Sequence, residues 1–440
     1  MQRCVVAQDY DVVIIGAGPA GLSFARSLSE LPLKVLILER SSLATLQNPP
    51  EDGREIALTH LSVSLMKGLG AWEHLPKEEV SPIEGAKVFD GESSYSLNFE
   101  RDKTDLEALG YLVPNHLIRK AFYESVLPKS NIELRTEATV EGVATEAEFG
   151  VVTLVNGETV TAKLVIAADT RFSDMRRKMG LSATMKDFSR TAIVCRMSHS
   201  KSHQQTAFEC FHYGQTTAIL PMTGNRSSIV VTVNSRDAQR YVDMSPAHFN
   251  QCIEQQLNGM LGDMVLLGKR HVYPLVAVHA NQFVARRFAV IGDAAVGMHP
   301  VTAHGFNLGL RGQASLAKHI AEAIADGRDI GSDVVLKAYE RDHIKVTRVL
   351  YHGTNVVVGL FTHETFAAKL ARKATLRLAN NIVPVKKWIM QSLTEEQMDE
   401  SSPMKWVRPL LPPRPSLAHL NSVFSHLPDP LAPLKKRSTK

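Results

Sequence analysis

Residues 11–39 read as a buried strand, a glycine-rich turn, a helix and a second strand, and this order restricts the fold more than any other feature. The strand expected over 11–15, apolar from Val12 to Ile15, precedes Gly16-Ala17-Gly18-Pro19-Ala20-Gly21, which fits the pattern G-x-G-x-x-G. A helix is expected over 19–29, and a strand over 34–38 ends at Glu39. This βαβ arrangement is typical of doubly wound α/β sheets that bind a dinucleotide.

The three glycines of the turn have distinct physical roles. Gly16 permits the tight turn, Gly18 lets a pyrophosphate approach the backbone, and Gly21 lets the helix pack closely on the sheet. The helix N-terminus adds free N–H groups and a positive dipole end. Glu39 is placed to bind a ribose hydroxyl, and its charge disfavours the 2′-phosphate of NADP. The motif alone does not separate FAD from NAD, and a βαβ unit without a ligand is the alternative.

A second strand–turn–helix unit occurs far along the chain. Residues 288–291 read as a buried strand, Gly292 and Asp293 end it, Pro300 stiffens the turn, and a helix begins at Gly305. Asp293 at the carboxyl end of a parallel strand can accept hydrogen bonds from the polyol chain of a flavin. N–H groups at the helix start suit the negative charge of a reduced flavin. A capped helix without a ligand is the alternative for this segment alone.

Between these units, residues 191–278 change to shorter strands interrupted by helices near 238 and at 246–261. We therefore predict an α/β fold with a discontinuous, Rossmann-like FAD-binding domain and a second, mostly antiparallel β-sheet substrate domain. The predicted boundaries are 1–82, 108–182 and 283–350 for the FAD-binding domain, 83–107 and 183–282 for the substrate domain, 351–395 for C-terminal helices and 396–440 for a proline-rich tail.

The bulk properties exclude several functions. A net charge of +5 over 440 residues does not argue for nucleic-acid binding. The four cysteines form no C-x-x-C pair, so no metal site or redox pair is predicted. No signal peptide and no run of 18 uncharged apolar residues are found, so we expect a cytoplasmic protein, soluble or peripherally attached to the inner membrane.

The two units together resemble the aromatic-hydroxylase group of FAD monooxygenases, which has the p-hydroxybenzoate hydroxylase-like fold. A closer resemblance is to the ubiquinone-biosynthesis hydroxylases, over roughly residues 10–395. It is carried by 11–39, by the R-x-x-A-L stretch that begins at Arg54, by Tyr273-Pro274-Leu275, and by Gly292-Asp293 continuing to Gly305-Phe306-Asn307-Leu308-Gly309. Thr170, Val296, His304 and Gly312 stand where the family has other residues, so the resemblance implies a divergent member.

The resemblance implies an FAD-dependent monooxygenase that hydroxylates the aromatic ring of a polyprenylated ubiquinone precursor through a C4a-hydroperoxyflavin. Its partners would be the polyprenylated phenol or quinol and dioxygen, with electrons from NAD(P)H or a separate reductase. A ubiquinone-biosynthesis complex and peripheral membrane contact are further expectations. The alternatives are a flavin hydroxylase or reductase of another aromatic or isoprenoid compound, and a non-catalytic FAD-containing scaffold.

The predicted site residues follow from the motifs and the resemblance. His299 and His304 are expected at the flavin edge near the substrate, with an ordinary loop histidine as the alternative. Arg119 is expected near FAD, with a surface charge as the alternative. Phe208, Phe211 and Tyr213 can face an apolar substrate or belong to a plain core. The predicted cofactor-binding residues are Gly16, Gly18, Pro19, Ala20, Gly21, Glu39, Arg40, Arg54, Arg119, Asp169, Gly292, Asp293, Pro300, Gly305, Phe306 and Asn307.

Overall fold

The central sheet is built around the first strand. A computed structural model describes residues 9–90, 96–100, 107–212, 214–299 and 304–362. The strand order is β17-β18-β11-β1-β2-β8, with β10 attached to β11 and β9 to β10. The strands are β1 (Tyr10–Ile15), β2 (Val35–Leu38), β8 (Ile132–Arg135), β9 (Val140–Thr145), β10 (Gly150–Leu154), β11 (Thr159–Ala167), β17 (Val284–Ala285) and β18 (Phe288–Val290). Because β18, β11, β1, β2 and β8 pair in parallel, their carboxyl ends lie at one edge.

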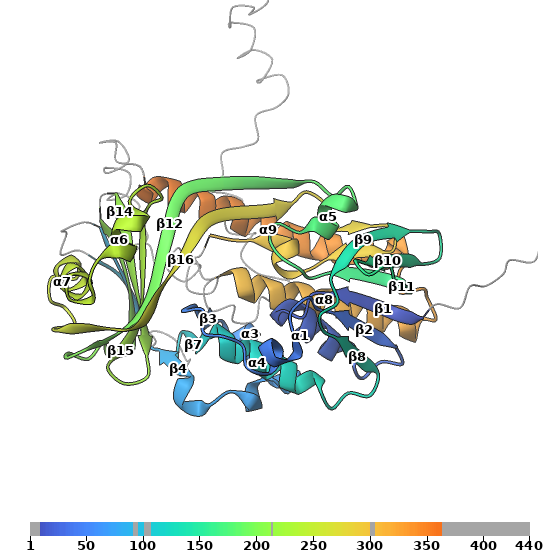
Figure 1. Ribbon diagram of the computed structural model, residues 1–440, viewed down its shortest axis with the longest axis horizontal. Coiled ribbons are helices and arrows are strands. Elements are labelled where there is room, and N and C mark those ends of the chain that lie inside the picture. Colours follow the sequence, from blue (N-terminus) through green and yellow to red (C-terminus); the bar gives the residue numbers. More distant parts are fainter. Residues whose placement is uncertain (1–8, 91–95, 101–106, 213, 300–303, 363–440) are drawn as a thin grey trace, which may run out of the picture. The chain divides into compact units, whose positions relative to one another are not determined.

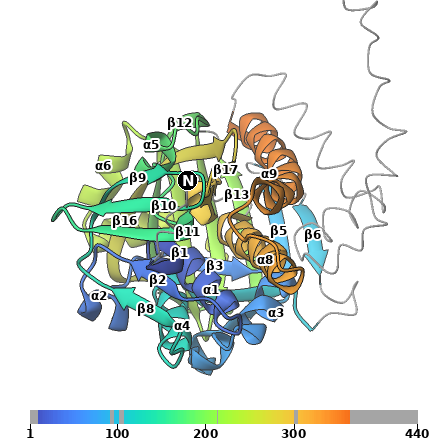
Figure 2. The ribbon, with the colours of Figure 1, turned by 90° about the vertical axis from the view of Figure 1, so that its right-hand side faces the viewer.

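Helices cover this sheet, which explains why its inner strands are apolar on both faces. The strand β2 is buried along its whole length. The helix α1 packs against both α4 and α8, and α8 packs against α9, beside which it lies in Figure 2. The helices are α1 (Pro19–Leu28), α2 (Leu43–Gln47), α3 (His60–Gly68), α4 (Asn115–Val126), α5 (Asp174–Lys178), α8 (His304–Ala325) and α9 (Asp333–Thr362).

A second large sheet has the order β19-β16-β12-β15-β14-β13-β5-β6 and stands at the other end of the described structure in Figure 1. Its neighbours pair antiparallel except β13 and β5, which are parallel. One of its faces packs on α6 (Ala238–Asp243) and α7 (Pro246–Gln256). The strands are β5 (Gly85–Asp90), β6 (Ser96–Glu100), β12 (Ala183–His199), β13 (Thr206–His212), β14 (Gln215–Met222), β15 (Arg226–Asn234), β16 (Met264–Ala280) and β19 (Val296–Gly297).

A small sheet lies against the second large sheet, since its strands β4 and β7 contact β14. It has the order β3-β7-β4, formed by β3 (Glu55–Leu58), β7 (Gly110–Pro114) and β4 (Ser81–Ile83). The long strands β12 and β16, of 17 residues each, run from one large sheet toward the other (Figure 1).

The predicted fold class, with a parallel α/β sheet, a mostly antiparallel second sheet and helices late in the chain, is confirmed. The domain boundaries stay a prediction, although β5 and β6 do join the second sheet. Of the region predicted as C-terminal helices, α9 is described to Thr362, and the remainder, with the tail, lies outside the described residues. None of the described helices is both long and apolar enough to cross a membrane.

Candidate functional site

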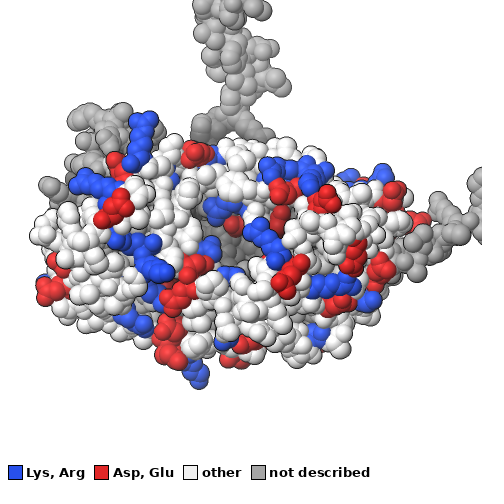
Figure 3. Space-filling model, in the orientation of Figure 1, with Lys and Arg blue, Asp and Glu red and all other residues white. Residues whose placement is uncertain are grey.

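The two large sheets enclose a cavity of about 980 Å³. One of its walls is the carboxyl edge of the central sheet, and the opposite wall is a face of the second sheet. Figure 3 shows the molecule hollowed in this region, with Lys and Arg side chains beside the opening. The predicted site residues that line it are Gly16, Gly18, Pro19, Ala20, Glu39, Arg40, Arg54, Arg119, Asp169, Gly292, Asp293, His299, Gly305 and Phe306.

The glycine turn has the geometry of a phosphate cradle. Gly16 has a φ of +109°, and a Cβ there would lie 2.6 Å from the carbonyl oxygen of Ala168. A Cβ at Gly21 would lie 2.0 Å from the carbonyl oxygen of Gly16, so this glycine allows α1 to sit on the turn. At Gly18, by contrast, a Cβ would meet nothing within 4 Å. Gly18 therefore leaves open space where a ligand can approach the N-terminus of α1.

The backbone holds the carboxylate of Glu39 beside this turn. One oxygen, Oε2, accepts a hydrogen bond from the N–H of Ala17 at 2.7 Å, and Oε1 accepts one from the N–H of Ser41 at 2.8 Å. A carboxylate oxygen can accept more than one hydrogen bond, so both retain capacity for a ligand hydroxyl. The side chain is thus positioned at the carboxyl end of β2, as the ribose-binding prediction requires.

The two sequence motifs meet in space. Gly292 has a φ of +58°, and a Cβ there would lie 2.5 Å from the Cβ of Ala20. A Cβ at Gly309 of α8 would lie 3.5 Å from the Cα of Gly292, so α8 also packs closely on this turn. The Gly-Asp turn, which forms the short 3-10 helix η4 (Gly292–Ala294), therefore packs against the glycine-rich turn.

Arg171 holds Asp293, and the motifs did not indicate this pair. Its Nη2 lies 3.2 Å from Oδ2 of Asp293, and its Nη1 donates a 3.0 Å hydrogen bond to the carbonyl of Val276. Both side chains line the cavity. The arginine thus orients the carboxylate and offsets part of its charge.

Asp169 supplies an observation that points to a ligand. It follows β11 at the carboxyl edge and lines the cavity. Its Oδ1 is buried and, among the described residues, has no hydrogen-bond partner. Since an unsatisfied buried acceptor costs about 1–3 kcal/mol, a ligand donor at this position would be stabilising. The open space at Gly18, the held carboxylate of Glu39 and this unsatisfied oxygen fit FAD, a long molecule with a pyrophosphate and several hydroxyls.

Arg54 belongs to a small hydrogen-bond network that the sequence motifs did not indicate. Its Nη2 and Nε contact Oδ2 of Asp52 at 2.6 and 3.0 Å, and Asn115 donates a 2.7 Å hydrogen bond to the same oxygen. The hydroxyl of Tyr273 donates to the carbonyl of Asp52 at 2.6 Å. Burial would raise the pKa of Asp52, but the charge and hydrogen bonds of Arg54 outweigh it, and the pKa lies below its ordinary value. The ionised Asp52 fixes the guanidinium at the cavity wall, where the predicted pyrophosphate contact stays a prediction.

The two predicted flavin-edge histidines differ in position. His299 is buried and lines the cavity. Its ring contacts the ring of Phe188 edge-on, with 4.7 Å between the ring centroids. Burial, helped by the charge of Lys186, lowers the pKa of His299 to about 4, so its ring is neutral at pH 7. His304 is buried at the start of α8 and is not among the described residues that line the cavity.

Three further predicted cofactor residues lie away from the cavity wall or cannot be placed. Gly21 packs under the turn instead of lining it. The side chain of Asn307 donates to the carbonyl of Ala57 at 2.9 Å and accepts from the N–H of Thr59 at 3.2 Å, which ties α8 to β3. Pro300 lies outside the described residues.

The wall of the cavity formed by the second sheet is mostly apolar. Phe211 faces the cavity, whereas Phe208 belongs to the core under α6 and α7, and Tyr213 lies outside the described residues. Glu209 on β13 is an acid within this wall, and Glu55 on β3 of the small sheet is a second acid that lines the cavity. Burial raises the pKa of Glu55 to about 7, although the charge of Arg196, whose Nε lies 2.8 Å from its Oε1, acts in the opposite direction.

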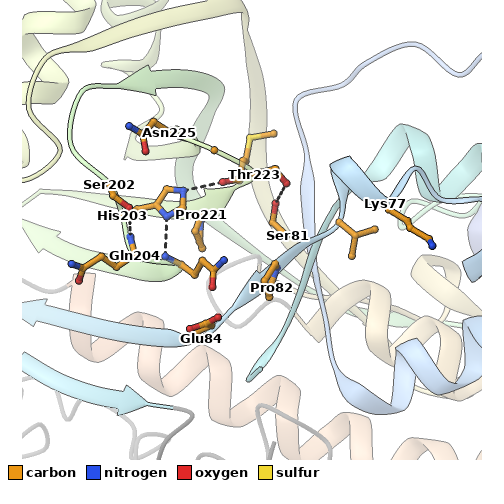
Figure 4. Close-up of a pocket in the computed structure, with 14 residues that line it drawn as sticks. Lys77, Ser81, Pro82, Glu84, Ser202, His203, Gln204, Pro221, Thr223 and Asn225 are labelled. Atoms are coloured by element: carbon orange, nitrogen blue, oxygen red, sulfur yellow. Dashed lines mark hydrogen bonds between the residues drawn. The ribbon is translucent and has the colours of Figure 1, made fainter. Parts of the chain in front are cut away.

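A second hollow, of about 530 Å³, lies beside β4 and the turn between β14 and β15 (Figure 4). Its buried histidine, His203, has both ring nitrogens engaged, with the carbonyl of Met222 at 2.9 Å and the N–H of Gln205 at 3.0 Å. The hydroxyls of Ser81 and Thr223 bond each other at 2.9 Å. These groups satisfy one another, so the hollow offers a ligand little chemistry.

A glycine-rich turn and a Gly-Asp turn, packed together at the carboxyl edge of a parallel sheet, are the arrangement expected of a flavoprotein that binds FAD with both motifs. The family of FAD binding domains matches residues 9–352. The chain belongs to this family, and its cofactor is FAD.

Relatives and solved structures narrow the class. The chain is 48% identical over 388 residues to ubiquinone hydroxylase UbiM of Neisseria meningitidis, covering 87% of this chain and 84% of that protein. It is 32% identical over 381 residues to ubiquinone hydroxylase UbiL of Rhodospirillum rubrum, covering 87% and 88%. The structure of p-nitrophenol 4-monooxygenase PnpA from Pseudomonas putida has a TM-score of 0.72 at 18% identity and covers 89% of this chain and all of that one, which shows the shared fold. The predicted resemblance is confirmed, and the protein is an oxidoreductase of the FAD monooxygenase class, which uses dioxygen.

Proposed function

We propose that the protein hydroxylates the aromatic ring of a polyprenylated ubiquinone precursor. The observation that carries the proposal is that one cavity places the FAD motifs opposite a wall of mostly apolar side chains. Such a wall suits a phenol that carries a hydrocarbon chain, since burying that chain is favourable. The identity of 48% to a ubiquinone hydroxylase over most of both chains supports the same substrate class.

Bound FAD would supply the activation of dioxygen that ring hydroxylation requires. The residues of this chain bind and orient: the glycine turn and the N-terminus of α1 would hold the pyrophosphate, and Glu39 a ribose hydroxyl. Arg171 fixes Asp293, the candidate for the polyol chain. His299, neutral and buried, adds a polar atom to the cavity without adding charge. The apolar strands of the second sheet would exclude water from the reacting ring.

We further propose transient contact with the inner membrane, because a polyprenylated substrate dissolves in lipid. The electrons would come from NAD(P)H or from a separate reductase, and a complex with other ubiquinone-biosynthesis proteins would shorten the path of the substrate. Flotation of the purified protein with vesicles of phosphatidylethanolamine and phosphatidylglycerol tests the membrane contact. Protein that remains at the bottom of the gradient at physiological salt would contradict it.

The function is tested by expression in a bacterium that lacks its ubiquinone ring hydroxylases, followed by extraction and mass analysis of the quinones. We expect ubiquinone to reappear, and the intermediate that disappears identifies the hydroxylated carbon. The matched control is Gly18→Ala, whose added methyl group meets no protein atom within 4 Å but points into the cofactor space. Protein that contains FAD but restores no ubiquinone would contradict the proposed substrate and favour another aromatic compound or a non-catalytic scaffold.

A further inference from the structure

Glu209 lies on β13, at one side of the cavity face of the second sheet. Strand pairing places it directly opposite Ala218 of β14, which pairs with Val230 of β15, and Val230 pairs with Val194 of β12. Paired residues share a face of a sheet, so these four side chains form one row. All four line the cavity. The row is apolar except for one carboxyl group, which faces the space opposite the FAD motifs.

No cation in the described part of the chain pairs with the carboxyl of Glu209. Among the described residues it makes no hydrogen bond or ion pair, in contrast to Glu55, which is paired with Arg196. The basic residue on the same wall, Arg190, donates its hydrogen bond to the carbonyl of Gly214 instead. A carboxylate held among aliphatic side chains without a partner is costly, and a protein tolerates such a group mainly where it serves a site.

Glu209 is half-buried in the cavity wall, and its removal from water among apolar side chains raises the pKa of its carboxyl to about 8. The group is therefore mostly protonated at pH 7 and ionises slightly above it. An ordinary glutamate, with a pKa of about 4.3, is far too weak a base to hold the proton of a phenol, whose pKa is about 10. Burial brings the two acidities closer, which is the condition for effective proton transfer between them.

We propose that Glu209 binds the ring hydroxyl of the phenolic substrate and sets which edge of the ring faces the FAD wall of the cavity. This inference rests on the proposed function. The carboxylate accepts the hydrogen bond of the phenol, and as the ring is attacked it takes the phenol proton. The O–H bond of the phenol breaks, and its electron pair moves into the ring as the attacked ring carbon bonds to oxygen. When that carbon loses its C–H proton to solvent and the ring becomes aromatic again, Glu209 returns its proton to the ring oxygen. No other co-reactant is needed for this transfer.

The first test compares two probes, 2-geranylphenol and its O-methyl ether, in which a methyl group replaces the hydroxyl hydrogen and removes the hydrogen-bond donor. Binding to the FAD-loaded protein at pH 8.5 is followed by the change in flavin absorbance. We expect the phenol to bind about tenfold more tightly than the ether in the native protein, and Glu209→Gln to remove most of this preference. The matched control is Glu141→Gln, at an exposed position of β9. Equal preference in the native protein and Glu209→Gln would overturn the inference.

The second test is the pH dependence of kcat/KM for the phenol. We expect the native rate to rise with pH toward a plateau above about 8, since Glu209 must lose its proton to act as the acceptor. Glu209→Gln should be at least about tenfold slower above pH 8 and lack that rise. Glu55, Arg190, Tyr273 and His299 also line this cavity, and the charged residues of its other walls are Glu39, Arg40, Arg54, Arg119, Asp169, Arg171, Asp174 and Asp293. Of these, Glu55 has a pKa near the window, of about 7. A rise that persists in Glu209→Gln would assign the titration to Glu55 and overturn the proton-accepting role.

The two proposals fail separately. If the native protein binds FAD but hydroxylates no prenylated phenol, the proposed function fails. If it hydroxylates the phenol and Glu209→Gln does so with the same rate, pH profile and ring position, only the role of Glu209 fails. Unchanged FAD content and melting temperature in Glu209→Gln establish that a lost rate is not a folding defect.

Discussion

The neighbouring glycines Gly18 and Gly21 should fail in different ways when each gains one methyl group. A Cβ at Gly18 meets nothing within 4 Å, and its φ of −74° is ordinary for alanine. A Cβ at Gly21 would lie 2.0 Å from the carbonyl oxygen of Gly16, so α1 would have to move by about 1.4 Å to restore an ordinary contact of 3.4 Å. Gly18→Ala should therefore spare the fold, and Gly21→Ala should strain it.

The expected magnitudes follow from these contacts. For Gly18→Ala, the lost cap preference of about 0.5–1 kcal/mol opposes a similar gain from a less flexible unfolded chain, so stability of the apoprotein changes little. Its FAD affinity should fall by about 1–3 kcal/mol, or roughly 5- to 150-fold, because the methyl group occupies the phosphate approach. Gly21→Ala should lose about 3 kcal/mol of stability, which lowers the melting temperature by about 6 °C.

The assay is calorimetric melting of the apoproteins together with the quenching of FAD fluorescence on titration with each of them. The native chain provides the reference in both measurements. Gly18→Ala that binds FAD as tightly as the native chain would refute the placement of the pyrophosphate at this turn. If Gly18→Ala melts at a temperature as low as Gly21→Ala does, the conclusion that a Cβ is accommodated at Gly18 but not at Gly21 would be refuted.

Three further outcomes are expected. Glu39→Gln should weaken FAD binding about tenfold, because the neutral amide can no longer accept from both backbone N–H groups and a ribose hydroxyl equally well; equal dissociation constants by fluorescence titration would contradict this. Arg196→Gln should cost about 3 kcal/mol, and more at pH 8 than at pH 5, because it leaves the buried Glu55 carboxylate without its partner; urea unfolding at the two pH values measures the difference. Burial lowers the pKa of His343 to about 3, whereas in the unfolded chain the pKa of a histidine is about 6.5. The folded state therefore loses stability as the pH falls from about 6.5 toward 3, because the unfolded chain takes up a proton that the folded His343 does not. His343→Gln should make the melting temperature fall less steeply between pH 7 and 4.5.

The parts of the fold that the sequence predicts are those in which near neighbours decide the structure. The run 12–15 is apolar because helices cover both faces of the strand, and the turn at Gly16 needs a positive φ that glycine adopts easily. The same reasoning predicted a strand over 288–291, one residue longer than the observed β18, and the Gly-Asp turn after it. Both motifs were thus available from spacing, and the FAD assignment followed from the two motifs together with the family resemblance.

The network around Arg54 was missed because its partners come from different segments. Asp52 lies two residues before Arg54, and this spacing was a weak signal of their ion pair. Asn115 and Tyr273 are far away in the sequence and reach Asp52 only in the folded protein. Arg171 likewise meets Asp293 across 122 positions of the chain. Side-chain pairs of this kind depend on tertiary packing, which no local pattern specifies.

The substrate wall shows the same limit at the level of a whole strand. β13 was not predicted because most of its residues on both faces are buried or half-buried, so the segment shows little of the alternation that identifies a half-exposed strand. Only the pairing with β14 and β5 reveals that Glu209 and Phe211 share the cavity face while Phe208 and Cys210 face the opposite core. A one-residue shift of that register would move Glu209 into the apolar core under α7, where nothing could take up its charge. The position of this carboxyl, and with it the chemistry of the substrate wall, is therefore set by strand register, whereas the FAD wall is set by two short motifs.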